Sequence, residues 1–252
     1  MGNGSGGATA LPILGVRAHE VASRAVVVGD PARVADVTVH LEDAREIGRS
    51  REYVTWTGRF DGVPVTVGSH GVGSAGAAIC FEELARAGVR RIVRAGTCGG
   101  LQTEVVDGDL VVGTAAVRDD GLTDRFVPPE WPAAADPALT LTLAREATGP
   151  DRTTHVGVVY TAANFYPGPL DDEPRWRPYH RAGALAVEME FAALLVIAQL
   201  HRIAAGGVFA VDGNLLDAAE DMSDYDPDRA VVDRAKEAMV PAALRALVAD
   251  AR

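Results

Sequence analysis

Cysteine is scarce in this chain. Cys80 and Cys98 are the only two among its 252 residues, which is too few for a disulfide framework. Neither lies in a CxxC pair or beside histidines at the spacing of metal ligands, so the pattern indicates no metal centre. We therefore expect two reduced thiols.

Positive charge is also in deficit. The chain carries 24 Lys and Arg against 35 Asp and Glu, a formal net charge of -11. Such a surface repels nucleic-acid backbones and anionic membranes, so neither is an expected partner. An anionic ligand must instead be bound by a few individually placed arginines.

Long apolar runs are absent as well. No stretch approaches the roughly 18 apolar residues that suffice to span a bilayer. Residues 1–10 are rich in small residues and lack the basic segment of a secretory signal. We expect a flexible tail over residues 1–10 and one domain over residues 11–252, in a cytoplasmic protein.

The rest of the chain alternates β-rich runs with segments of helical period, which predicts an α/β fold with a sheet wrapped by helices. Expected strands, most of them apolar enough to be central, are Ala25–Val28, Tyr53–Phe60, Val63–Ser69, Arg91–Ala95, Asp109–Ala116, His155–Tyr160 and Gly207–Val211. Expected helices are Pro31–Val37, Ser74–Ala87, Pro137–Ala147, Phe191–Leu200 and Asp228–Ala251. The proline-rich stretches Phe126–Asp136 and Pro167–Pro178 are predicted loops, too short for interdomain linkers.

A GxGxxG motif spans Gly71 to Gly76, after a strand and before a helix. It meets the outline of the dinucleotide fingerprint, but the next strand ends in Arg94 and a glycine-rich turn rather than in an acidic residue for a ribose. We therefore do not expect a nicotinamide cofactor. The glycines indicate close approach of the backbone, either to a neighbouring strand or to a ligand.

Arginines occur at three expected strand ends. Gly29 ends a turn that leads to Arg33 and a helix beginning at proline, Arg94 is followed by Thr97, and Arg51 opens a third strand. Each alone is typical of a solvated surface charge. Together, in an acidic protein, they favour binding of an oxyanion such as phosphate.

Carboxylates stand in apolar surroundings at two places. Glu188 and Glu190 lie in an apolar run, where a helix would point them in nearly opposite directions, so one of them is expected to face a ligand and accept hydrogen bonds from ribose hydroxyls. A structural ion pair is the alternative for these two residues.

Asp212 follows an apolar strand, where burial raises the pKa of a carboxyl and suits it to donate a proton. The alternative is that Asp212 and the following glycine only initiate a turn.

These residues belong to a series of motifs that resembles the nucleoside phosphorylase family, which includes purine nucleoside and uridine phosphorylases. The motifs run in order over roughly positions 12–215, and the segments around 69–83 and 211–213 look most like parasite-type purine nucleoside phosphorylases. They are VGDPAR (28–33), REY (51–53), SHGVGSAG (69–76), FEEL (81–84), RAGTCG (94–99), FYPG (165–168), VEME (187–190) and VDG (211–213). The resemblance implies a single α/β domain with a mixed, partly barrel-like central sheet surrounded by helices.

The resemblance also implies roles for individual residues. Asp212 is the expected catalytic acid, Glu190 the ribose ligand, and Arg51 a phosphate ligand contributed by a neighbouring subunit of a hexamer built from dimers. Phosphate is a co-substrate, and no metal or organic cofactor is implied. The expected phosphate ligands are Gly29, Arg33, Arg51, Arg94 and Thr97, and the expected nucleoside contacts are Cys98, Gly99, Phe165, Val187, Glu188, Met189 and Glu190.

Two departures from the family affect substrate choice. Uridine phosphorylases carry Gln and Arg just after FYPG, whereas this chain has Pro169 and Asp171 there, so uridine is disfavoured. The family histidine that binds the ribose 5′-hydroxyl from the adjacent subunit aligns near Ile13, and His19 lies too far along. We therefore expect a purine nucleoside, inosine- or guanosine-like, or one modified at the 5′ position, as in purine salvage or a specialised pathway.

Other classes remain as alternatives. A nucleosidase of the same superfamily would use water, against which the intact set of phosphate residues argues. A non-catalytic nucleoside-binding protein would be expected to have lost Asp212 or the phosphate arginines. An oxidoreductase would rest on the GxGxxG motif alone.

Overall fold

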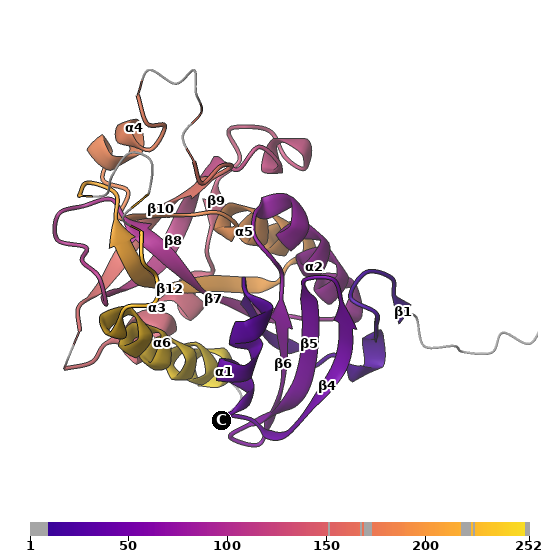
Figure 1. Cartoon of the computed structure of the whole chain (residues 1–252). Coiled ribbons are helices and arrows are strands. Elements are labelled where there is room, and N and C mark those ends of the chain that lie inside the picture. Colours follow the sequence, from indigo (N-terminus) through magenta and orange to yellow (C-terminus); the bar gives the residue numbers. More distant parts are fainter. Residues whose placement is uncertain are drawn as a thin grey trace, which may run out of the picture.

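The computed structural model describes residues 10–150, 152–166, 168, 173–217, 223 and 225–249. Its centre is one mixed sheet in the order β11-β10-β8-β12-β7-β3-β6-β5-β4, and β11 also pairs with β7. Strands β7, β12, β8, β10 and β11 thereby close into a barrel, and the remaining strands extend it on one side (Figure 1). The expected partly barrel-like α/β domain is confirmed.

Four strands of the barrel are longer than the apolar runs that predicted them, and the fifth, β11, was not predicted as a strand. They continue past the apolar core into glycines and polar residues, and these extensions carry much of the site described below. Their bounds are β7 Arg91–Gly100, β8 Leu110–Asp119, β10 Thr154–Ala162, β11 Ala186–Glu188 and β12 Ala204–Asn214.

The extension of the sheet begins at β3 (Arg24–Val28). β5 (Tyr53–Phe60) and β6 (Val63–Ser69) have the predicted bounds. β4 (Glu42–Ser50) was not expected, because its exposed polar residues show no apolar alternation. Short pairs complete the strands: β1 Ala10–Leu11 with β2 Val16–Arg17, and β9 Ala133–Ala134 against β8.

Helices cover the two faces of the sheet. α2 (Ser74–Ala87) packs against α5 (Phe191–His201), and α3 (Pro137–Ala147) packs against α6 (Ala230–Val248) on the other side. Each pair contributes to its own large apolar cluster, so the sheet is buried from both sides. The alternation of strands and helices along the sequence reflects this layering.

Local signals explain several helix ends. Gly73 and Gly88 flank α2 with φ of 89° and 102°, conformations that favour glycine. At the start of α3, Asp136 Oδ1 accepts the Leu139 N–H at 2.8 Å, and proline follows at the first helical position.

Other predicted elements needed correction. The expected helix Pro31–Val37 is a 3-10 turn, Pro31–Arg33, followed by α1 (Val34–Thr38). The helix expected from Asp228 begins at Ala230. The two predicted loops contain short elements, β9 in one and the start of α4 (Arg177–Arg181) in the other, and both are too short for a periodic signal.

Candidate active site

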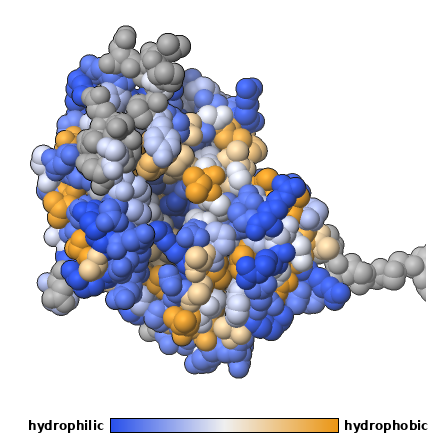
Figure 2. All heavy atoms as spheres, in the orientation of Figure 1, coloured by the Kyte–Doolittle hydropathy of each residue, from blue (hydrophilic) through white to orange (hydrophobic). Residues whose placement is uncertain are grey.

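A cleft of about 1510 Å³ opens where β3, β7 and β12 end. These three strands run parallel, so the residues that follow or terminate them meet at one edge of the sheet. Figure 2 shows the hollow in the molecular surface, with hydrophilic residues inside it and along part of its rim and hydrophobic residues beside it. The predicted site residues that line it are Gly29, Arg33, Arg94, Thr97, Cys98, Gly99, Phe165, Val187, Glu188, Met189, Glu190 and Asp212.

Arg94 lies at the buried end of the cleft with 4% of its surface exposed. Its Nη1 lies 3.3 Å from Glu188 Oε2, and its Nη2 pairs with Glu190. Nε and Nη1 of this guanidinium donate no hydrogen bond to any described residue. A buried guanidinium with spare donors can bind an anion in a bidentate manner.

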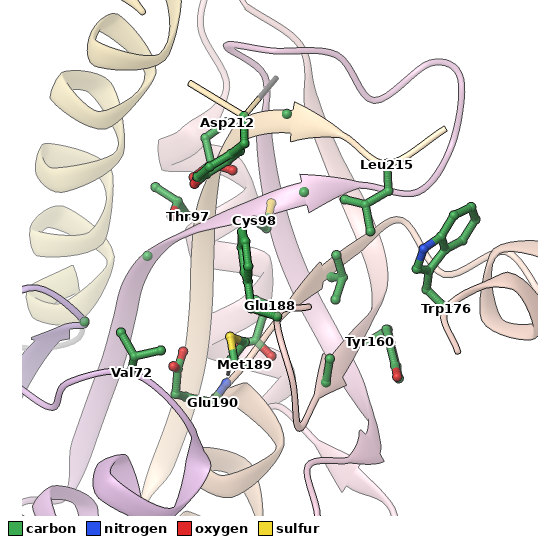
Figure 3. A pocket seen from close by; sticks show the side chains of 18 of the residues that line it. Val72, Thr97, Cys98, Tyr160, Trp176, Glu188, Met189, Glu190, Asp212 and Leu215 are labelled. Atoms are coloured by element: carbon green, nitrogen blue, oxygen red, sulfur yellow. Dashed lines mark hydrogen bonds between the residues drawn. The ribbon is translucent and has the colours of Figure 1, made fainter. Parts of the chain in front are cut away.

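Glu188 and Glu190 both face Arg94, which corrects the expectation that only one of them would face the site. The reason is local: Glu188 ends β11 and Glu190 precedes the first residue of α5, so the pair spans a strand-to-helix turn rather than a helix. Figure 3 shows both side chains with Met189 between them. The sequence left two alternatives for this pair, contact with a ligand or a structural ion pair. Both carboxylates form an ion pair with Arg94, and both also line the cleft.

The two carboxylates differ in their other partners. Glu188 accepts the Thr161 hydroxyl at 2.5 Å and the Phe191 N–H at 2.8 Å, and burial raises its pKa despite the Arg94 charge. Glu190 accepts the Gly73 N–H at 2.6 Å. The GxGxxG turn therefore fixes Glu190 with its backbone.

Asp212 lies in β12 with 4% of its surface exposed. Burial raises the pKa of its carboxyl above the ordinary range. Hydrogen bonds from Tyr225, at 2.8 Å, and from Thr97 oppose that rise, as does the positive charge of Arg33. A carboxyl whose pKa is set by these opposing effects can hold a proton and donate it to a proton acceptor.

Gly29 and Arg33 flank the turn after β3. Asp30 Oδ1 accepts the Ala32 N–H at 2.8 Å and caps the short 3-10 helix that begins at Pro31. Arg33 is thereby brought to the cleft wall, on the side of Asp212.

Three residues discussed from the sequence lie apart from the cleft lining. Arg51 stands in the turn between β4 and β5, exposed and with φ of 54°. Ile13 donates its N–H to Glu83 Oε1 at 3.0 Å and packs partly against the core, and His19 is exposed in a short 3-10 helix. Pro169 and Asp171 lie outside the described residues.

The remaining nucleoside contacts lie on different elements. Phe165 follows β10, is 44% exposed and makes an edge contact with the Tyr225 ring, with centroids 5.6 Å apart. Val187 lies in β11, beside Gly99 of β7. Cys98 is a free, buried thiol whose pKa burial raises well above the usual value, and Cys80 is free as well, so the prediction of two reduced thiols is confirmed.

Sequence reasoning missed several cleft residues. Tyr225 and Trp176 lie in stretches that are acidic or proline-rich, where nothing in the pattern marks an inward side chain. His70 does not line the cleft but lies behind it, next to Gly29; it is fully buried, with Nδ1 donating to the Gly71 carbonyl at 2.8 Å. His70 is part of the SHG motif, but the sequence around a histidine in an apolar segment does not indicate which residues it will contact in the fold.

A family model described as the phosphorylase superfamily matches residues 23–248. This chain belongs to that superfamily. It is 33% identical over 229 residues to a uridine phosphorylase of Treponema pallidum, covering 86% of this chain and 89% of that protein. It is 38% identical over 189 residues to a purine nucleoside phosphorylase of Plasmodium vivax, covering 75% and 77%.

Solved structures agree with this assignment. The purine nucleoside phosphorylase of Toxoplasma gondii in complex with immucillin-H superposes with a TM-score of 0.89 at 33% identity, covering 96% of each chain. The protein is therefore an enzyme of the nucleoside phosphorylase family, acting on a nucleoside and phosphate. Relatives of both the purine and the uridine type match, so membership leaves the base open. No helix in the described part of the chain is long and apolar enough to cross a membrane.

Proposed function

We propose that this protein is a purine nucleoside phosphorylase. It converts a purine ribonucleoside or 2′-deoxyribonucleoside and phosphate into the free base and the sugar 1-phosphate. The observation that carries the proposal is the grouping of Arg94, Glu190 and Asp212 in one cleft: a buried cation, a carboxylate for sugar hydroxyls and a carboxyl of raised pKa. Phosphate is the co-substrate, and no other cofactor takes part.

Phosphate binds at the ends of β3 and β7. Arg33 and Arg94 supply guanidinium forks, with Gly29 giving backbone access and Thr97 a hydroxyl. Arg51 completes this site from the neighbouring subunit of a dimer-based hexamer, which accounts for its place outside the cleft of its own chain. An anion bound beside the sugar supplies both the nucleophile and the stabilisation of positive charge on the sugar ring.

The nucleoside lies between the two carboxylate regions. Glu190 accepts hydrogen bonds from the 2′- and 3′-hydroxyls, with Met189 against the sugar. Phe165, Cys98, Gly99, Val187 and Glu188 surround the base. A phosphate oxygen forms a bond to C1′ while the bond from C1′ to the base nitrogen breaks, and the electron pair of that bond moves into the base.

Asp212 provides the proton for the leaving base. A purine anion leaves poorly, so transfer of the Asp212 proton toward N7 lowers the barrier, and burial, which raises the pKa of this carboxyl, favours its protonated form. The nucleoside is inosine- or guanosine-like. A 5′-modified sugar is accepted, because Ile13 offers an apolar side chain where the family supplies a histidine from the adjacent subunit. The role is purine salvage or a related cytoplasmic pathway.

The experiment is release of free base from inosine, 5′-methylthioinosine, adenosine and uridine, each with and without phosphate, followed by chromatography. Purine release that requires phosphate is the expected result. Release without phosphate would assign a nucleosidase, and uridine as the preferred substrate would assign a uridine phosphorylase, the second candidate that the Treponema relative supports. A preference of ten-fold or more for inosine over 5′-methylthioinosine would overturn acceptance of the 5′-modified sugar.

A further inference from the structure

The cleft has a second end, away from Arg94 and Glu190. Tyr160, Val187 and Leu215 line it together with Trp176, and Figure 3 shows Trp176, Leu215 and Tyr160 on the side opposite Val72 and Glu190. We refer to the space beside Tyr160, Trp176, Val187 and Leu215 as the aromatic chamber. Pockets for drug-sized ligands are about 300–1,000 Å³, and the whole cleft, at about 1510 Å³, exceeds that range.

The aromatic chamber has its own apolar floor. Leu101, Tyr160, Ala162 and Ala184 form a third buried cluster, separate from the two large ones. Trp176, Val187 and Leu215 pack against this cluster but remain partly exposed, and they line the cleft. Apolar side chains gathered in a concave wall are typical of a ligand-binding surface.

The wall is held in place by hydrogen bonds. His180 Nδ1 donates to the Leu101 carbonyl at 2.6 Å, and Gln102 Nε2 donates to the carbonyls of His180 and Ala184 at 3.0 and 2.8 Å. These bonds tie α4, whose N-terminal flank is Trp176, to the end of β7. The aromatic chamber is thus preformed.

Leu215 is fixed from the other side. Its N–H donates to the Gly100 carbonyl at 3.0 Å, and its side chain lies over Gly99, where a Cβ would meet Leu215 Cδ1 at 2.3 Å. The same Cβ would lie 3.4 Å from Val187 Cγ1. Glycine at position 99 therefore lets Leu215 and Val187 converge at the inner edge of the aromatic chamber.

Two polar groups beside the aromatic chamber are paired with the same carboxylate. The Tyr160 hydroxyl donates to Asp119 Oδ2 at 2.7 Å, and Arg175 Nε lies 3.6 Å from the same oxygen. The Arg177 guanidinium lies 6.0 Å from the centre of the Trp176 ring. The side chains of Tyr160, Trp176, Val187 and Leu215 thus offer a ligand mainly apolar surface, with the Arg175 and Arg177 guanidinium groups beside it.

We propose that the aromatic chamber is a subsite for bases larger than a purine, which extend as a flat aromatic system beyond the point where Asp212 meets the imidazole ring. This rests on the proposed function, since it needs the sugar at Glu190 and the imidazole at Asp212. The substrate class is then purine nucleosides with a fused or planar aromatic extension on the six-membered-ring side.

The test compares inosine with its linear tricyclic analogue, in which a benzene ring separates the imidazole from the pyrimidine ring. Trp176→Ala and Leu215→Ala remove the wall, and Trp131→Ala is the matched control, since Trp131 is 47% exposed and lies outside the cleft lining. The wild type is expected to cleave the tricyclic nucleoside with kcat/KM within about ten-fold of that for inosine. Loss of an apolar contact should lower kcat/KM for the tricyclic substrate roughly ten-fold or more in the two wall variants, with inosine changed far less.

Calorimetry with the two free bases separates the failure of this proposal from failure of the proposed function. Tighter binding of the tricyclic base than of hypoxanthine, weakened by Trp176→Ala, supports the aromatic chamber even if no phosphorolysis occurs. A tricyclic base that binds more weakly than hypoxanthine, or a preference that Trp176→Ala and Leu215→Ala leave unchanged, overturns it while inosine phosphorolysis stands.

Discussion

The phenol oxygen of Tyr225 donates a hydrogen bond of 2.8 Å to Oδ2 of Asp212. The Tyr225 ring also lies over Gly213 and makes an edge contact with Phe165, at 5.6 Å between centroids. The proposed acid therefore has a donor that stabilises its charged form, supplied by a residue in the segment before α6. This contact affects the pH at which Asp212 can act as an acid.

Tyr225→Phe should shift the alkaline limb of the kcat/KM profile to higher pH. The hydrogen bond from Tyr225 lowers the pKa of Asp212 against the larger effect of burial, so its removal raises that pKa further. Asp212 must be protonated to act, hence activity persists to higher pH. Tyr166→Phe is the control, because Tyr166 contacts Phe165 but lies outside the cleft lining. An unmoved limb in Tyr225→Phe would mean that the contact is structural alone.

Asp212→Asn should abolish most of the phosphorolysis of inosine. An amide of similar shape can still donate a hydrogen bond but cannot transfer a proton, and general acid catalysis contributes about 100- to 10,000-fold. The measurement is single-turnover base release at saturating phosphate, with an unchanged melting temperature as the check on folding. A loss below about ten-fold would move the acid role to another group.

The fold was largely predictable from local signals, because the buried strands and the capped helices α2 and α3 satisfy their own periodicity and end at glycine or proline. The convergence of Glu188 and Glu190 on Arg94 was not predictable from local signals. It depends on β11 pairing with both β7 and β10, which brings Glu188 from a distant part of the chain to the end of β7. Likewise, Trp176 becomes a wall residue because Gln102 and His180 fix α4, and neither contact leaves a trace in sequence periodicity.

Glu190→Gln should weaken the preference for ribose over 2′-deoxyribose. The carboxylate is held by the Gly73 N–H and by Arg94, and it presents charge to the 2′- and 3′-hydroxyls. Hydrogen bonds to a charged group contribute about 1.5–3 kcal/mol, so kcat/KM for inosine should fall roughly 10- to 100-fold, and that for 2′-deoxyinosine less. Glu173→Gln, at an exposed position, is the control. Equal losses on both sugars would remove Glu190 from contact with the 2′-hydroxyl.

Gly96→Ala should raise the KM for phosphate. A Cβ at position 96 would lie 2.4 Å from Arg94 Nη1 and 2.9 Å from Cζ, so the guanidinium must move while the fold is retained. Loss of one charge-assisted hydrogen bond predicts a rise of roughly ten-fold or more. Gly68→Ala is the matched control, since its Cβ would make ordinary contacts of 3.9 and 4.0 Å with Cys80 and Val27. An unchanged KM in Gly96→Ala would place phosphate away from Arg94.

His70 should make the protein less stable in mild acid. Burial, followed by the charge of Arg94, lowers the pKa of its imidazole from 6.5 to about 4, although Glu190 opposes the shift. As the pH falls below about 6.5, His70 takes up a proton in the unfolded chain, whereas in the folded chain it stays neutral until about pH 4. The free energy of unfolding is therefore highest above pH 6.5 and decreases as the pH falls from 6.5 to 4. The linkage predicts a loss of about 2 kcal/mol in the free energy of unfolding between pH 7.5 and 5.

The variant His70→Phe preserves an edge contact with Phe81, where the ring centroids lie 5.3 Å apart, and its phenyl ring cannot bind a proton. Urea unfolding of both proteins at the two pH values measures the difference, which isolates His70 from the carboxyl groups that titrate in the same range. If the variant loses as much stability on acidification as the wild type, His70 is not the group responsible.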